Sequence, residues 1–178
     1  SYNGADSFTF KTNDGTVDSN IATVSITVSP VNDLPVSADQ TVATQEDAPV
    51  VIELSANDID GNTLTYAIVT PPAHGTLSCT NCDNPTYTPD LNYHGTDSFT
   101  HKANDGTADS NIATVSITIS PVNDMPFANN QNVTLLEDNT KAITLTGSDV
   151  DGDVFTFTVL TQPAHGTLTG SGADYTYT

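Results

Sequence analysis

The chain is poor in positive charge. Its 178 residues include three lysines, Lys11, Lys102 and Lys141, and no arginine, against 22 acidic residues and a net charge of −19. Phosphate backbones and anionic lipid surfaces are bound through clustered lysine and arginine, so nucleic acid and anionic membranes are not expected as partners. No apolar run approaches the ~18 residues of a membrane-spanning helix, so no membrane insertion is expected either.

Recognisable catalytic motifs are missing as well. The sequence has no serine–histidine–acid spacing, no phosphate loop and no His-Glu-x-x-His segment. Of the four histidines, His74 and His165 recur in the same Pro-Ala-His-Gly turn, which indicates a structural role, whereas His94 and His101 do not recur. We therefore do not expect an enzyme.

A domain-sized internal repeat is the dominant feature. The segment Val31-Asn32-Asp33-Leu34-Pro35 returns 91 residues later as Val122-Asn123-Asp124-Met125-Pro126, and residues 72–77 return as residues 163–168. A unit of about 90 residues can form one small sandwich domain with its own core. We expect residues 1–34 to be the last two strands of one repeat, residues 35–125 a complete repeat, and residues 126–178 the first five strands of a third. The chain would then be a fragment of a longer array.

Within each repeat, short apolar–polar alternations predict β-strands. Ala22, Val24, Ile26 and Val28 alternate with serine and threonine, which is typical of a strand with one buried face. The complete repeat contains seven such segments with turn residues between them and no helical periodicity. This pattern predicts an all-β protein made of tandem seven-stranded antiparallel β-sandwiches.

The two cysteines, Cys79 and Cys82, fall in the predicted turn between the fourth and fifth strands of the complete repeat. One Cys-x-x-Cys provides too few ligands for a zinc site and lacks the helix start of a thioredoxin motif. A local disulfide in an oxidising compartment is favoured. A redox pair and free thiols are the alternatives.

Paired aspartates suggest a metal site. Asp58-Ile59-Asp60-Gly61 returns as Asp149-Val150-Asp151-Gly152. Calcium takes six to eight oxygen ligands, more than one such pair can supply, so further ligands must come from elsewhere. The Asn-Asp segments at the repeat junctions are the natural source. The alternative is that these segments are solvated acidic turns.

Together these motifs resemble a known family. The set Glu46-Asp47, Asp58-x-Asp60-Gly61-Asn62, Asp105-Gly106 and Val122-Asn123-Asp124-x-Pro126 is similar to the bacterial cadherin-like tandem repeats of large surface adhesins. The resemblance implies a cadherin-like or Ig-like Greek-key sandwich, an extracellular or bacterial cell-surface location, and Ca²⁺ between consecutive domains. By position, Asn32 and Asp33 would share ions with Asp58, Asp60 and Asp105, and Glu46, Asn123 and Asp124 would share ions with Asp149 and Asp151. The cadherin Asp-Arg-Glu motif is absent, which implies fewer ions per junction.

Two functions follow. The first is a structural segment of an extracellular adhesin or fibre, stiffened by calcium. The second is a carbohydrate-binding module of a polysaccharide-binding surface protein. Sugar sites usually offer an aromatic platform, but tryptophan is absent and the phenylalanines fall at core positions. The candidate rings are therefore Tyr2, Tyr87, Tyr93, Tyr175 and Tyr177.

The split repeat at the two ends of the chain suggests a partner. Neither residues 1–34 nor residues 126–178 can close a core alone, and each would expose a sheet edge. We expect copies of the chain to associate head to tail into a filament by strand complementation, with the first two strands of one copy completing the third repeat of another. Phe8, Phe10, Val24 and Ile26 should then pack against Phe155, Phe157 and Val159 of the neighbouring copy. A hairpin folded onto residues 35–125, or left free in solvent, would count against this arrangement.

Overall fold

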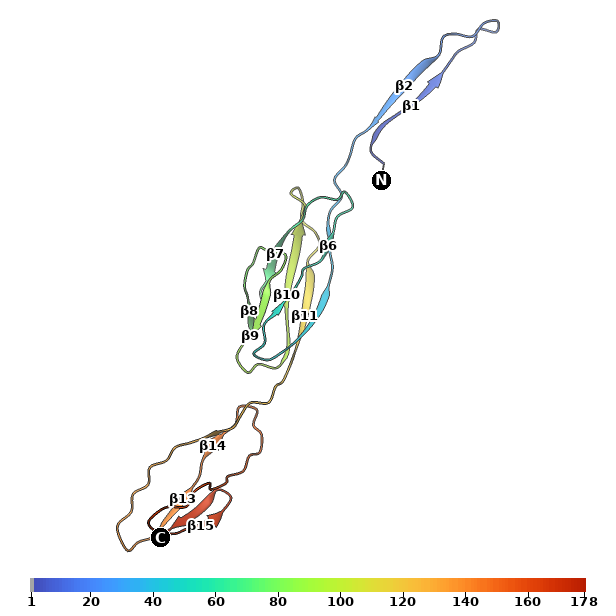
Figure 1. The fold of residues 1–178 in the computed structure, drawn as a ribbon. Coiled ribbons are helices and arrows are strands. Elements are labelled where there is room, and N and C mark those ends of the chain that lie inside the picture. Colours follow the sequence, from blue (N-terminus) through green and yellow to red (C-terminus); the bar gives the residue numbers. More distant parts are fainter. Residues whose placement is uncertain (1) are drawn as a thin grey trace.

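Residues 2–178 are described by a computed structural model, and within that range the chain forms β-strands and no helix. It follows that no described segment is a helix of the length and apolarity that a membrane crossing requires. Figure 1 shows three parts in line: an N-terminal hairpin, a complete sandwich and an incomplete C-terminal unit. The all-β class predicted from the alternation is confirmed.

The complete unit is a sandwich of two main sheets. Its strands are β3 (Val36–Ser37), β4 (Gln40–Gln45), β5 (Val50–Val51), β6 (Ala56–Asn57), β7 (Thr65–Thr70), β8 (Gly75–Leu77), β9 (Thr86–Pro89), β10 (Gly95–Asn104) and β11 (Ala113–Ser120). One sheet has the order β4-β11-β10-β7 and the other β5-β9-β8, while β3 pairs with β6.

Two details differ from the predicted antiparallel sandwich. The first of the seven predicted strands, residues 36–45, divides, because β3 pairs with β6 whereas β4 pairs with β11 in the other sheet. The β4–β11 ladder is also parallel, while the other ladders of this unit are antiparallel. The physical reason is that the chain enters this unit at one end and leaves at the other, so its first and last long strands run in the same direction (Figure 1).

The core of the complete unit lies between these sheets. Its buried side chains are Ile52, Leu54, Tyr87, Phe99, Val115, Ile117 and Ile119. Along β11 the buried residues alternate with more exposed serine and threonine, as the sequence pattern predicts for a strand with one face in the core.

A buried carboxylate ties the two sheets together. Asp97 on β10 is only 8% exposed. It accepts hydrogen bonds from the main-chain N–H groups of Ala73 (3.0 Å), His74 (2.9 Å) and Ser98 (2.8 Å) and from the Tyr87 hydroxyl (2.8 Å). Burial alone would raise the pKa of Asp97, but these four bonds outweigh it and the pKa is lowered. We call this arrangement the Asp97 hub.

The N-terminal hairpin consists of β1 (Gly4–Phe10) and β2 (Ala22–Val28). Its register, from Gly4↔Val28 onward, matches that of β10 and β11 from Gly95↔Ile119 onward. The hairpin stands apart from the complete unit (Figure 1), and Phe8 and Phe10 are 54% and 47% exposed. The single chain thus leaves these rings in solvent, which is one of the two outcomes named above as counting against head-to-tail association; their packing against another copy stays a prediction.

The C-terminal unit forms one sheet and part of another. Here β12 (Phe127–Ala128) pairs with β14 (Gly147–Ser148), and β13 (Lys141–Thr144), β16 (Asp174–Tyr177) and β15 (Leu168–Ser171) form a sheet in the order β13-β16-β15. This sheet corresponds to β5-β9-β8 of the complete unit.

The predicted third strand of the C-terminal unit, around Phe155, Phe157 and Val159, forms no ladder, and neither do residues 131–136. These segments correspond to β7 and β4, whose partners in the complete unit are β10 and β11. A strand needs such a neighbour for its main-chain hydrogen bonds, which explains the difference. The side-chain alternation is kept, and Phe155 and Phe157 pack edge to face with ring centroids 5.7 Å apart.

Candidate metal sites at the inter-unit junctions

The first junction joins the hairpin to the complete unit through side-chain amides and carboxylates. The Asn32 side-chain amide (Nδ2) donates to Asp105 Oδ2 at 2.8 Å, and the main-chain N–H of Asp33 donates to Asp60 Oδ2 at 2.7 Å. The Asn62 amide also donates to Asn32 Oδ1 at 3.3 Å. The structure therefore brings together four residues of the predicted set, and it adds Asn62, which belonged to the sequence motif but not to the predicted ligands.

Asp58 shapes the loop that faces this junction. Its Oδ1 accepts the main-chain N–H groups of Asp60 (2.9 Å) and Asn62 (3.2 Å). Gly61, between them, has a φ of +76°, a conformation that side chains with a Cβ rarely adopt. The second oxygen of Asp58, Oδ2, is enclosed and has no hydrogen-bond partner. One oxygen thus holds the loop while the other remains free to bind a cation.

Hydrogen bonding also favours the charged form of Asp105. The pKa of Asp105 is lowered, first by the bond from the Asn32 side chain and then by bonds from the main chain of Ala108 and Thr107. This carboxylate therefore stays ionised well into the acid range, as a cation ligand must.

The second junction repeats the main-chain link of the first. The N–H of Asp124 donates to Asp151 Oδ2 at 2.6 Å, as Asp33 does to Asp60. The N–H of Val122 donates to Glu46 Oε1, so the end of the complete unit is tied back to its own first half. The Asn123 side chain donates to the carbonyl of Asp124 at 2.7 Å, and no side-chain bond from it to Asp149 or Asp151 is present.

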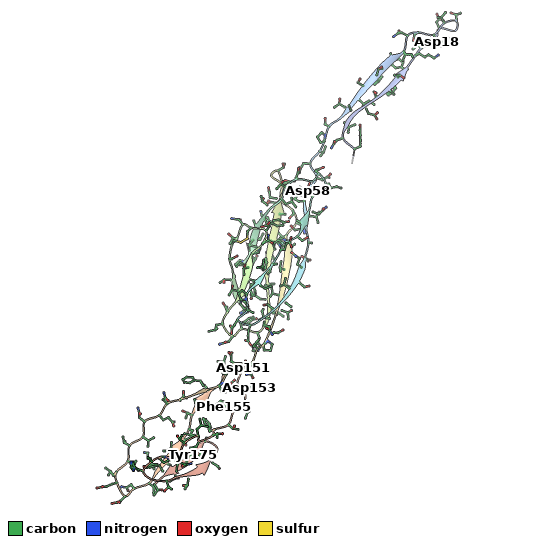
Figure 2. All side chains as sticks on the ribbon, in the orientation of Figure 1. Asp18, Asp58, Asp151, Asp153, Phe155 and Tyr175 are labelled. Carbon is green, nitrogen blue, oxygen red and sulfur yellow. A yellow bond between two sulfur atoms is a disulfide. The ribbon has the colours of Figure 1, made fainter. Side chains whose placement is uncertain are left out.

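Three aspartates gather on the loop that follows. Asp149, Asp151 and Asp153 each place one carboxylate oxygen within 4.8 Å of those of the other two. Figure 2 shows Asp151 and Asp153 beside the connection between the complete and C-terminal units. Asp153 lies outside the predicted set, and Asn62 occupies its position in the complete unit. The alternating Asp-x-Asp-x-Asp spacing was the signal that could have found it.

Two carboxylate oxygens at this junction are buried without a hydrogen-bond partner. Glu46 is 4% exposed, and its Oε2 accepts no hydrogen bond; His94 Nδ1 lies 3.6 Å away. Asp124 Oδ2 is likewise enclosed and unpaired. The pKa of Asp124 is raised, first by desolvation and then by the negative charges of Asp151, Asp47, Glu46 and Asp149. Withdrawing carboxylates from water without a counter-charge is costly, and a bound cation would remove that cost.

The donor atoms at both junctions fit Ca²⁺. This ion prefers carboxylate and carbonyl oxygens and takes six to eight of them. The second junction offers carboxylates from Glu46, Asp47, Asp124, Asp149, Asp151 and Asp153. The lysine ion pairs that the described residues form, Lys11–Asp18 and Lys102–Asp109, involve other aspartates. The first junction is less acidic, because Asn62 stands where the second has Asp153.

Comparison with known proteins places the chain in a family. A family model described as Bacterial Ig domain matches residues 32–118 and 123–178. The chain belongs to the bacterial Ig domain family. This confirms the Ig-like sandwich fold and the resemblance to bacterial sandwich repeats.

One curated protein and two solved structures show how much of this bacterial Ig chain its relatives share. Integrin beta-like protein A of Dictyostelium discoideum is 31% identical over 143 residues, which cover 68% of this chain and 7% of that protein. An endo-fucoidan hydrolase of glycoside hydrolase family 107 aligns with 99% of this chain and 29% of its own, at 17% identity and a TM-score of 0.41. Domains 4–9 of the surface layer protein SbsC align over 99% and 31% of the two chains, at 15% identity and a TM-score of 0.37. The chain thus spans a small part of each of these relatives.

The two cysteines of the complete bacterial Ig unit form a local disulfide. Cys79 and Cys82 are joined by a disulfide, three residues apart in sequence, in the segment between β8 and β9.

Most of the candidate aromatic rings for a sugar platform are buried or packed within the bacterial Ig units. Tyr87 is fully buried, and Tyr93 stacks on His74 with ring centroids 4.1 Å apart and planes 7° apart. Tyr175 and Tyr177 are half-buried, whereas Tyr2 is 63% exposed. Polysaccharide binding through these rings stays a prediction.

Proposed function

We propose that this chain is a non-catalytic spacer segment of an extracellular protein, of the kind that bacteria display at their surface, and that Ca²⁺ at the junctions holds its Ig units in line. The observation that carries the proposal is the pair of buried, unpaired carboxylate oxygens, Glu46 Oε2 and Asp124 Oδ2, at the boundary between two units. A structural spacer needs rigid boundaries, and these oxygens lie at the place where an ion would bridge one unit to the next.

The role of the ion is electrostatic. Without a cation, the carboxylates of Glu46, Asp47 and Asp124 face those of Asp149 and Asp151 across the junction, and like charges repel. Chain connection and the Asp124–Asp151 bond then have to hold the units together against that repulsion. With Ca²⁺ bound, the same carboxylates become ligands of one centre, and bending the junction would pull ligands away from it.

An extracellular location agrees with the disulfide. Cys79 and Cys82 are paired in the structure, and such bonds persist in oxidising compartments. Membership of the bacterial Ig domain family supports a surface protein in the same way.

The stabilisation of the folded state by bound Ca²⁺ can be bounded from typical calcium affinities. Extracellular calcium modules have dissociation constants of ~10⁻⁴–10⁻³ M, so 10 mM Ca²⁺ would stabilise the folded state by ~1.4–2.7 kcal/mol. For a unit of this size, that corresponds to a rise in melting temperature of roughly 6–20 °C.

The test is calorimetry and small-angle X-ray scattering on the full chain, in Ca²⁺ and in chelator. We expect chelation to lower the melting temperature and to shorten the mean end-to-end extent. Glu46→Gln and Asp153→Asn should each weaken calcium binding, because each removes a carboxylate from the second junction. Asp83→Asn is the matched control, since it removes one exposed charge that is not among the carboxylates gathered at the second junction. Identical melting and scattering curves with and without chelator would refute the proposal.

A further inference from the structure

The first and last segments of the complete unit lie side by side. β4 pairs with β11 in a parallel ladder of six consecutive residue pairs, which starts at Gln40↔Val115. Further hydrogen bonds continue this contact past both ends of the ladder. We call the whole contact, between residues 37–46 and residues 110–122, the terminal seam.

Side chains extend the terminal seam at its first-junction end. The Asn111 side chain brackets the main chain of Ser37, because it accepts the Ser37 N–H and donates to the Ser37 carbonyl, each at 3.0 Å. Asp39 Oδ1 accepts the N–H of Thr114 at 2.7 Å. Ser37 is only 4% exposed, so the bonds at its main chain are shielded from water. The two segments are therefore joined before β4 begins.

Glu46 extends the terminal seam at its second-junction end. The main-chain N–H of Glu46 donates to the Ser120 carbonyl at 2.9 Å, and the Val122 N–H donates to Glu46 Oε1. Glu46 thus adds one bond through its backbone and another through its carboxylate. Only Oε1 takes part, so these bonds form whether or not an ion binds Oε2.

The hydrophobic core covers one side of the ladder. Val115, Ile117 and Ile119 of β11 are 2% exposed or less, and Val42 of β4 packs against the same core cluster. Separating the two strands would require water to replace their main-chain bonds and would also disturb this packing. Bonds that are shielded from water are stronger than exposed ones, so the seam should open slowly.

The position of the terminal seam determines how tension along the chain is carried. The chain enters the complete unit at one end and leaves it at the other (Figure 1). Tension therefore pulls residues 37–46 toward the first junction and residues 110–122 toward the second. Because β4 and β11 are parallel, the two segments can separate only by sliding past each other, which loads their bonds together. The main chain between the segments, residues 47–109, is bypassed while the seam holds.

We propose that the complete unit resists mechanical force, and that the terminal seam is the clamp that keeps it folded under tension along the row of Ig units. Forced unfolding depends on the rate of unfolding, so a clamp of this kind protects the unit whatever its equilibrium stability. The inference goes beyond the spacer proposal, because the seam lies within one unit and forms without an ion.

The first experiment changes only the direction of the force. One chain, carrying Pro49→Cys and Pro121→Cys, is stretched in chelator by single-molecule force spectroscopy, either between its ends or between the two new cysteines. Its native cysteines are already paired and do not compete for attachment. Pulling between the ends shears the seam, whereas the new cysteines follow β4 and β11 at the same end of the seam and load its bonds one after another.

The expected difference is one of force. Rupture by end-to-end pulling should free about 85 residues between Ser37 and Val122, which extend to roughly 280–310 Å. The unit should rupture at a several-fold lower force when pulled between the cysteines. Equal rupture forces in the two geometries would overturn the clamp. The calcium dependence of melting tests the spacer proposal separately, since the pulling is done without calcium.

The second experiment removes bonds from the terminal seam. Asn111→Ala deletes the two bonds to Ser37, so the unfolding rate at constant tension should rise about five- to a hundredfold. Asn104→Ala is the matched control, because it deletes two side-chain bonds, to Asp109 and from Gly106, in the turn that the seam bypasses. Both variants should lower the midpoint of denaturant unfolding, but only Asn111→Ala should speed rupture. Equal acceleration by both variants, or none by Asn111→Ala, would overturn the clamp.

Discussion

A buried histidine in the complete unit allows a direct test of how the core affects stability and its dependence on pH. His101 on β10 is fully buried, and neither ring nitrogen makes a hydrogen bond of good geometry, although the Ser55 backbone lies near the ring. Its ring centroid lies 6.3 Å from that of Tyr66. At the equivalent position of the hairpin the sequence has Phe10. We therefore predict that His101→Phe stabilises the complete unit and removes part of its sensitivity to acid.

The change in the free energy of unfolding caused by His101→Phe can be estimated from the two unpaired nitrogens. An unsatisfied buried polar group costs about 1–3 kcal/mol, so replacing both relieves roughly 2–6 kcal/mol. Fitting the larger phenylalanine ring costs about 1–3 kcal/mol. The midpoints of these two ranges leave a net gain in the free energy of unfolding of about 2 kcal/mol at pH 8, where the imidazole is neutral in both states.

The pH dependence has a definite sign. Burial lowers the pKa of His101, and the nearby backbone of Ser55 and the charge of Asp39 oppose this only partly. The unfolded chain therefore binds the proton more readily than the folded one. The stability is complete above the unfolded pKa of about 6.5 and falls by up to ~1.4 kcal/mol per pH unit below it, until the lowered folded pKa is reached.

The assay is denaturant unfolding of the full chain and of His101→Phe at pH 8, 6.5 and 5. Both chains carry the same carboxylates and the same other histidines, so the difference between them isolates His101. That difference should be positive at pH 8 and should grow as the pH falls. A difference that stays constant across this range, or a variant that is less stable at every pH, would show that the imidazole does not sit unpaired in the core.

Two further predictions concern the complete unit. Tyr87→Phe removes the hydroxyl that bonds the Asp97 carboxylate and the His74 carbonyl, so denaturant unfolding should show a loss of about 1.5–3 kcal/mol; an unchanged midpoint would mean that the Asp97 hub does not stabilise the sandwich. Reducing the Cys79–Cys82 disulfide should cost at most about 2 kcal/mol, because the bond closes a very short loop. A loss well above 3 kcal/mol on reduction would contradict that reasoning.

The sequence by itself determined the features that depend on near neighbours. The alternation in residues 22–28, and its return one repeat period later in residues 112–119, predicted strands that the structure contains. The hairpin register is the same in β1–β2 and β10–β11, although only the second is packed in a core. Its turn is held by bonds between residues a few positions apart, such as Asn13 and Asp18, so the local sequence is sufficient to set it.

Only the tertiary structure decided the features that depend on distant partners. The pairing of Val122 with Glu46, and the enclosure of Glu46 Oε2, arise because β4 runs parallel to β11 and brings residues 76 positions apart together. The Asp97 hub likewise joins β10 to the start of β8 and to β9. No local pattern encodes these contacts, since they depend on how the sheets stack.

The same distinction explains the two ends of the chain. Phe155, Phe157 and Val159 carry the alternation of a strand, yet they form no ladder in the single chain. Alternation records which face a residue prefers to bury, whereas a ladder needs hydrogen-bond partners from another strand. The sequence could therefore place the apolar faces of both ends, but only the structure shows which of these segments form hydrogen-bonded ladders.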